Sequence, residues 1–140
     1  MYTDEFAKLW TKLSKDLKAH MEQHLAPSLT EGQLHVLEFL RGFDRVKTSD
    51  FIDYLATTPA AVTTILDRME KGGLIRRERD SADRRIVWVH MTEKGKEETA
   101  RGGKIREEFL AAHLGRLSAH NQQLLIYLLG KITNDPSQSH

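Results

Sequence analysis

The sequence predicts a mainly α-helical protein that carries one small β-hairpin. Three observations lead to this fold class. Apolar residues recur every three or four positions over most of the 140-residue chain, which is the spacing of one helix face. Capping and turn residues divide this pattern into six segments. Between the fourth and fifth segments, two β-compatible runs flank a polar loop, as in a hairpin.

The first predicted helix begins near Phe6 and ends before Pro27. Proline ends it because the ring fixes φ and removes the N–H that a helix interior needs. The apolar face of this helix consists of Phe6, Leu9, Trp10, Leu13, Leu17, Met21 and Leu25. A face of this length needs an apolar partner.

Two shorter helices follow the first. Thr30, with Gln33 three residues later, has the pattern of a capping box, and Gly42 suits the end of that helix. Thr48 is expected to cap the third helix, around residues 51–55.

The fourth helix is marked by Thr58 as its N-cap and Pro59 as its first residue. It ends at Gly72 and Gly73. Only a few residues separate it from the third helix, so the two form a helix-turn-helix.

The hairpin strands are predicted at Leu74–Arg79 and Ile86–Met91, with the polar residues 80–85 at the tip. A helix-turn-helix followed by such a hairpin is a winged helix. The second helix of such a pair has the size to enter the major groove of DNA.

Two amphipathic helices complete the chain. Thr92 is expected to cap a long helix that runs to about Leu117, and Ser118 to cap the last one. Gly102 and Gly103 lie inside the long helix, where each glycine costs roughly 1 kcal/mol relative to alanine. The pair indicates either a kink or close packing of two helices.

The predicted organisation is a winged helix-turn-helix at residues 30–91 and a helical dimerisation region at residues 1–29 and 92–134. The apolar faces of the terminal helices need cover, which a second copy of the chain would provide. Packing onto the chain's own core is the alternative. Residues 135–140 are polar and are expected to form a disordered tail.

Composition excludes several classes of function. The chain has no cysteine, which excludes disulfides, thiolate metal sites and thiol nucleophiles. No apolar run reaches the roughly 18 residues of a membrane span, so no membrane partner is expected. The first residues lack the apolar core of an export signal, and a cytoplasmic location is expected.

Positive charge is concentrated on the hairpin. Residues 68–85 contain seven basic and four acidic residues, a net charge of +3, whereas the other 14 basic and 16 acidic residues give −2. This distribution suits contact with phosphates through the hairpin. A solvated hairpin with paired charges is the alternative.

The start of the fourth helix favours DNA binding over that alternative. Short hydroxyls and methyls approach base edges closely, and thymine methyls suit apolar partners. The expected DNA-contacting residues of this segment are Thr57, Thr58, Ala60, Ala61, Thr63 and Thr64, followed by Arg68. Thr58 also has a purely structural role as the cap.

The sequence resembles the MarR family of transcriptional regulators. The stretches DRMEKGGLI at 67–75, DSADRR at 80–85 and MTEKG at 91–95 occur together at the spacing of that family. Residues 50–55 and 59–63 extend the match. The resemblance implies a two-fold dimer, built by the terminal helices, that binds a pseudo-palindromic double-stranded DNA operator and usually represses.

The resemblance also assigns the wing residues. Arg84 is expected to enter the minor groove, where a guanidinium responds to groove shape more than to base sequence. Arg85 is expected to form an ion pair with Asp67 and so fix the wing against the reading helix, or else to contact phosphate like Arg84. Asp83 belongs to the same wing-positioning set. Thr64 stands where many relatives carry arginine.

The resemblance further implies an effector, such as a small aromatic compound, that releases the protein from DNA. Trp10, Phe39 and Trp88 are candidates for the lining of its cleft, although aromatic residues at such spacing are also typical of a core. A metal-responsive regulator is an alternative, with the candidate ligands His20, His24, His35 and His113.

Other functions have less support. A winged helix that binds only protein conflicts with the charge of the hairpin. No phosphate loop and no nucleophile, base and orienting set suggests an enzyme, and no cofactor is expected.

Overall fold

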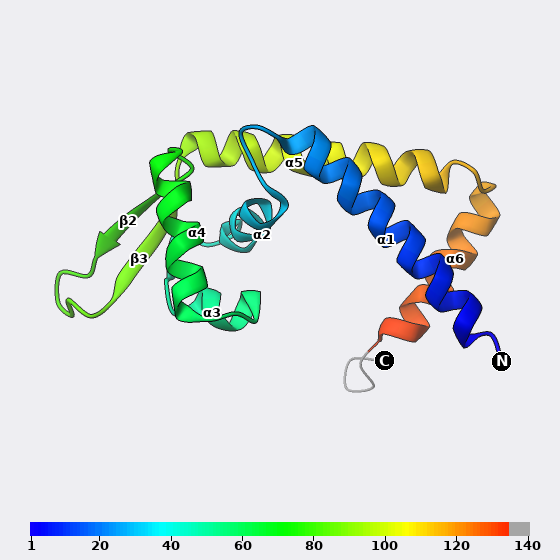
Figure 1. Cartoon of the computed structure of the whole chain (residues 1–140), viewed down its shortest axis with the longest axis horizontal. Coiled ribbons are helices and arrows are strands. Elements are labelled where there is room, and N and C mark those ends of the chain that lie inside the picture. The colour runs from blue at the N-terminus through cyan, green and yellow to red at the C-terminus, as the bar shows by residue number, and fades with distance from the viewer. Residues whose placement is uncertain (135–140) are drawn as a thin grey trace. The chain divides into compact units, whose positions relative to one another are not determined.

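A computed structural model describes residues 1–134, so the predicted tail at 135–140 lies outside the described residues. The chain has two compact units, Met1–Arg106 and a second that begins at Glu107. In chain order (Figure 1), the elements are α1 (Thr3–Leu25), α2 (Glu31–Leu40), β1 (Val46–Lys47), α3 (Asp50–Leu55), α4 (Pro59–Lys71), β2 (Ile75–Arg79), β3 (Val87–Met91), α5 (Glu93–Leu114) and α6 (Ala119–Thr133). The predicted fold class, mainly helical with a small β wing, is confirmed.

Most helix starts follow the predicted caps. The Thr30 hydroxyl accepts from the Gln33 N–H, and the Gln33 side chain accepts from the Thr30 N–H, which completes the capping box. The Thr58 hydroxyl accepts from the Ala61 N–H at 3.2 Å. The hydroxyls of Thr92 and Ser118 cap α5 and α6 in the same way.

The predicted cap of α3 is wrong by one residue. Ser49 holds the N-cap position, and its side chain makes no capping hydrogen bond. Thr48 instead continues the sheet, because its N–H donates to the Val87 carbonyl at 3.0 Å.

The sheet has three antiparallel strands in the order β1-β3-β2. The hairpin of β2 and β3 lies within one residue of the predicted bounds. Strand β1 was not predicted, because two residues are too few to show alternation. It pairs Val46 with Val89 and Lys47 with Trp88.

The core of the first unit includes the end of α1 as well as the winged helix. Its buried members include Met21 and Leu25 of α1 and Leu29 of the following loop. Ile105 of α5 packs against the same core. The last turns of α1 and the first half of α5 therefore support the winged helix directly.

Gly102 explains one close contact of α5. A Cβ at this position would lie 2.6 Å from Cδ1 of Leu34, a buried residue of α2. The helix continues through both glycines from Glu93 to Leu114. Close packing, rather than a kink, is the reason for Gly102.

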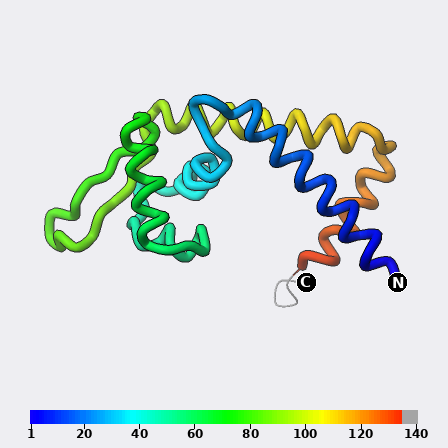
Figure 2. The backbone as a smooth tube through the Cα atoms, viewed as in Figure 1, coloured from blue at the N-terminus to red at the C-terminus, as the bar shows by residue number. Residues whose placement is uncertain are grey.

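Arg101 ties the end of α1 to α5. Its guanidinium donates to the carbonyls of His24 and Leu25, at 3.1 and 2.9 Å, and to the Ser28 hydroxyl. These carbonyls belong to the last turn of α1, where no helical N–H follows to bind them. Figure 2 shows the end of α1 and the loop after it beside the first half of α5.

A second ion pair joins α2 to α5. Arg106 donates to both carboxylate oxygens of Glu38, at 2.7 and 2.8 Å, and both side chains are mostly buried. The hydrogen bond from Arg106 is the main cause that holds the pKa of Glu38 below its ordinary value.

We expect Glu38→Gln to destabilise the protein by about 1 to 2 kcal/mol at neutral pH, because a charge-assisted pair becomes a neutral one. The lowered pKa means that the ionised Glu38 stabilises the fold above the ordinary glutamate pKa of about 4.3. This contribution is lost as the pH falls through the lower pKa of the folded state. Urea unfolding at neutral pH and near pH 3 measures the difference. An equal cost at both pH values would contradict the assignment.

Candidate nucleic-acid interface

Helix α4 presents one face to the core and one to solvent. Val62, Leu66 and Met69 are buried, at three- and four-residue spacing. The side chains on the opposite face are short and carry hydroxyl or methyl groups. Those of Thr58, Ala60, Ala61, Thr63 and Thr64 are exposed, and Thr57 is half-buried in the preceding turn. The structure thus brings the predicted contact residues of this segment onto one open surface.

The hydroxyl hydrogens of Thr63 and Thr64 are already used. Each hydroxyl donates to the carbonyl four residues earlier, in Pro59 and Ala60, at 3.0 Å. The methyl groups and the oxygen lone pairs remain available to a partner. This face therefore offers methyl contacts and hydrogen-bond acceptors, a chemistry that suits thymine methyls and base amino groups.

An ion-pair cluster joins the hairpin to α4. Arg77 of β2 lies 2.6 Å from Asp67 and 2.8 Å from Glu70, two carboxylates of α4. The Arg77 N–H also donates to Glu70, at 2.9 Å. The side-chain hydrogen bond from Arg77 is the main cause that lowers the pKa of Glu70.

The predicted ion pair between Arg85 and Asp67 is wrong. Arg77 takes this place because it pairs with Val89 beside the core, on the face of the sheet next to α4. Arg85 lies beyond the strands, in the tip, and binds Asp83 instead, with Nε and Nη2 each 3.0 Å from a carboxylate oxygen. This bond is the main cause that lowers the pKa of Asp83.

The wing tip holds Arg84 by its backbone. Its carbonyl accepts a hydrogen bond from Arg79 at 2.8 Å, and its side chain is exposed. Within residues 1–134, the side chains of Arg84 and Arg68 have no ion-pair partner. Over the same range, Arg79 of β2 donates to a carbonyl and not to a carboxylate, so positive charge that is not paired with an acid lies on α4, on the hairpin and at its tip.

Two further cations lie beside the wing, and the residue pattern did not predict them there. The Arg45 guanidinium lies 3.8 Å from the ring centre of Trp88, and the Lys47 ammonium lies 5.6 Å from it. Both residues precede the helix-turn-helix in sequence. Only the pairing of β1 with β3, invisible in the residue pattern, brings them to the hairpin.

The predicted aromatic cleft is not formed within one chain. Trp10 is exposed on α1 and stacks with Phe6. Phe39 stacks with Tyr54, with ring centres 4.2 Å apart. Trp88 belongs to the wing, as described above. These three residues therefore do not line one common cleft. Each lies on a different element, α1, α2 or β3, and has its own neighbours.

The predicted histidine metal site is also not assembled. His20 and His24 stack with ring centres 4.0 Å apart, and Nδ1 of His24 lies 2.9 Å from the His20 carbonyl. Nδ1 of His113 lies 2.8 Å from the Phe109 carbonyl, and His35 is exposed on α2. Over the described residues, no three His, Asp or Glu side chains are grouped so that they could hold a metal ion.

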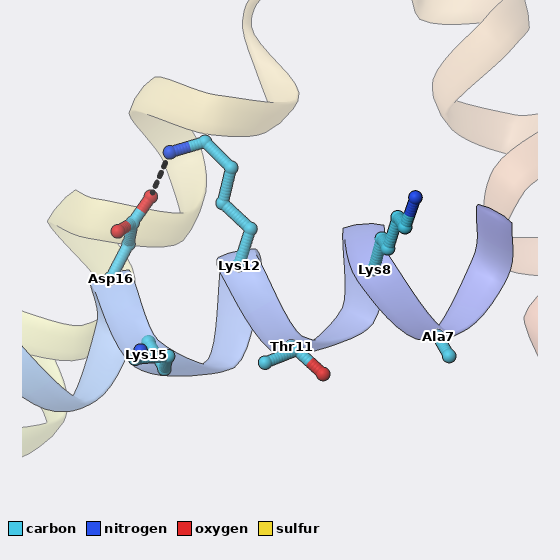
Figure 3. Close-up of a pocket in the computed structure, with 6 residues that line it drawn as sticks. All are labelled: Ala7, Lys8, Thr11, Lys12, Lys15 and Asp16. Carbon is cyan, nitrogen blue, oxygen red and sulfur yellow. Dashed lines mark hydrogen bonds and ion pairs between the residues drawn. The ribbon is translucent and has the colours of Figure 1, made fainter. Parts of the chain in front are cut away.

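Two helices expose large apolar side chains. On α1 these are Phe6, Leu9, Trp10 and Leu13, and on α6 they are Leu124, Ile126, Tyr127, Leu128 and Ile132. The opposite face of α1 is polar, with a shallow groove in which Lys12 reaches Asp16 at 3.4 Å (Figure 3). Among the described residues, no helix combines the length and apolar character needed to cross a membrane.

Comparison with known proteins agrees with the family resemblance seen in the sequence. The MarR family matches residues 29–87. The transcriptional regulator HosA of Escherichia coli O157:H7 is 36% identical over 116 residues, which cover 80% of this chain and 83% of HosA.

Two solved structures share the fold. The regulator BpsR of Bordetella bronchiseptica, whose DNA binding is regulated by 6-hydroxynicotinic acid, has a TM-score of 0.71 and 25% identity, and the match covers 93% of this chain and 99% of BpsR. A MarR mutant from E. coli complexed with operator DNA has a TM-score of 0.73 and 21% identity, over 96% of this chain and 99% of that one. Sequence, fold and site agree, and the chain belongs to the MarR family of DNA-binding transcriptional regulators.

Proposed function

We propose that this protein binds a pseudo-palindromic operator as a homodimer, represses transcription from the cytoplasm and leaves the operator when a small aromatic compound binds. The observation that carries the proposal is the juxtaposition of the open threonine face of α4 with a wing tip whose Arg84 has no ion-pair partner within residues 1–134. The first feature suits base edges in a major groove. The second suits the negative potential of a narrow minor groove.

The two elements have different tasks. Helix α4 and the turn before it supply short contacts through Thr57, Thr63 and Thr64, and Arg68 reaches phosphate from the last turns of α4. Arg84 enters the minor groove. Arg85, with 90% of its side chain exposed, contacts phosphate while Asp83 holds its other side.

The exposed apolar faces of α1 and α6 support the dimer. Among single chains, apolar patches of this extent mark interfaces. A second copy covers them and holds two α4 helices about one turn of DNA apart, roughly 34 to 36 Å. In this proposal, residues 1–29 and 92–134 form the dimerisation region and residues 30–91 the DNA-binding region, although the end of α1 and the start of α5 also complete the core of the latter.

The effector is proposed to bind between the end of α1 and the start of α2. A hollow of about 560 Å³ lies there, with an apolar wall of Ala26, Pro27 and Leu29. Lys18 and His35 line it as well, together with Glu22 and Glu31, so its polar wall carries both signs of charge and suits a hydroxylated aromatic compound that donates and accepts hydrogen bonds. The regulation of the related BpsR by a hydroxylated aromatic acid supports this class of ligand.

We expect Arg84→Ala to weaken binding to operator DNA about tenfold and to reduce the slope of log affinity against log salt by about one. The loss should be similar for different operator sequences, because a minor-groove arginine responds to shape. Fluorescence anisotropy with duplexes selected from genomic fragments, over a range of salt, measures both quantities.

Arg76→Ala is the matched control. Arg76 is an exposed arginine of the same hairpin, but it is paired with Glu78 at 3.1 Å. We expect it to bind like the parent. Parental affinity and salt dependence in Arg84→Ala would refute the assignment of the wing.

A further inference from the structure

The outer face of the three-stranded sheet carries Trp88 at its centre. Trp88 pairs with Lys47 on one side and with Glu78 on the other, and the side chains of such a row lie on one face. Arg45 covers the indole at 3.8 Å, a distance at which the cation and the ring attract each other. The indole is therefore held between the strands and a cation.

The edge of the same indole reaches the wing tip. Its Nε1–H donates to Oδ1 of Asp80 at 2.9 Å. The other oxygen of Asp80 accepts from the backbone N–H groups of Ala82 and Asp83, at 3.0 and 2.8 Å. Asp80 is the first residue after β2, so one carboxylate connects the body of the sheet to the turn.

The turn continues from these bonds to Arg84. The Ile86 N–H donates to the Asp83 carbonyl at 3.0 Å, and the Asp80 N–H donates to the Ile86 carbonyl at 2.9 Å. Arg84 lies inside this closed loop, and only its side chain extends from it. The conformation of the loop decides where the guanidinium points.

We propose that Trp88 is the positioning residue of the wing: through Asp80 it fixes the tip in the free protein and presents Arg84 in the conformation that binds DNA. Arg45 keeps the indole in place from the other side. A fixed loop loses less conformational entropy on binding than a flexible one. The effect on DNA rests on the proposed function, whereas the effect on the loop does not.

The hydrogen bonds of the loop give a test that needs no DNA. Trp88→Phe retains an aromatic ring beneath Arg45 but removes the N–H donor. We expect the amide hydrogens of Ala82 and Asp83 to exchange with solvent about fivefold faster in this variant, as measured by NMR on the full chain. Asp80→Ala, a change at the exposed tip, should accelerate the same two amides at least as much.

Arg76→Ala is the control for this measurement, because Arg76 lies on the same outer face and contacts Glu78 instead. Its loop amides should exchange at the parental rate. Unchanged exchange of Ala82 and Asp83 in both Trp88→Phe and Asp80→Ala would overturn the proposal.

A double-mutant cycle tests the effect on DNA binding. We expect Trp88→Phe to weaken operator binding about fivefold in the parent but less than about twofold in the Arg84→Ala background, because Trp88 acts through Arg84. Equal losses of operator affinity in both backgrounds would contradict the proposal that Trp88 acts on DNA binding through Arg84. Faster loop exchange with parental DNA affinity in Arg84→Ala would leave the loop assignment standing and refute the proposed role of Arg84.

Discussion

Gly95→Ala is expected to destabilise the protein by about 3 kcal/mol and to lower its melting temperature by about 10 °C. A Cβ at Gly95 would overlap the Leu74 carbonyl oxygen and lie 2.8 Å from Cγ of Met91. Flexible side chains yield to such contacts, but a backbone oxygen does not. The Leu74 carbonyl is fixed further because it accepts the Thr92 N–H, in the turn where α5 begins.

The matched control is Gly103→Ala in the same helix. A Cβ there has no neighbour within 4 Å among the described residues. Alanine is favoured over glycine by about 1 kcal/mol in a helix interior, so this variant should melt at a higher temperature than the parent. Thermal and urea unfolding of both variants measure these changes in stability. A Gly95→Ala protein as stable as the parent would mean that α5 does not begin against Leu74.

Leu9→Glu is expected to convert the proposed dimer into a monomer and to weaken operator binding about 100-fold or more. Leu9 is 69% exposed in the single chain, so the change should leave the fold of the monomer intact. In the proposed dimer the same position is covered, and a buried carboxylate without a partner is costly. Two half-sites bound by one linked pair give an affinity 10²- to 10⁴-fold above that of either half alone, and this gain is lost in a monomer.

Lys8→Glu provides the comparison, because it makes the neighbouring position acidic on the polar side of α1 (Figure 3). Sedimentation velocity and anisotropy should show it to be dimeric and to bind DNA far better than Leu9→Glu. If Leu9→Glu sedimented as a dimer with parental affinity, the apolar face of α1 would not be part of the interface.

Short-range features of the fold could be predicted from sequence. Thr30 with Gln33, Thr58 with Pro59, and Ser118 each act within one helical turn, and the structure contains all three caps. The two hairpin strands were predicted because their apolar pattern differs from that of the helices around them.

Features that depend on register could not be predicted. Charge spacing does not show which arginine meets Asp67, because that choice depends on which residues of β2 face α4. Arg45 reaches Trp88 only through a strand of two residues. For the wing tip, the sequence predicted roles for Arg84 and Asp83 but contained no sign of the hydrogen bond between the Trp88 indole and Asp80.

The bonds of Arg77 to two carboxylates of α4 limit how the proposed effector could release the protein from DNA. These bonds join the hairpin to α4, so a compound that only bent the wing would have to separate Arg77 from both Asp67 and Glu70. Rotation of one whole winged helix relative to that of the second copy in the proposed dimer would leave those bonds intact. In the proposed mechanism the effector therefore changes the spacing between the two winged helices of the dimer, and variants that loosen the hairpin should impair DNA binding without imitating the effector.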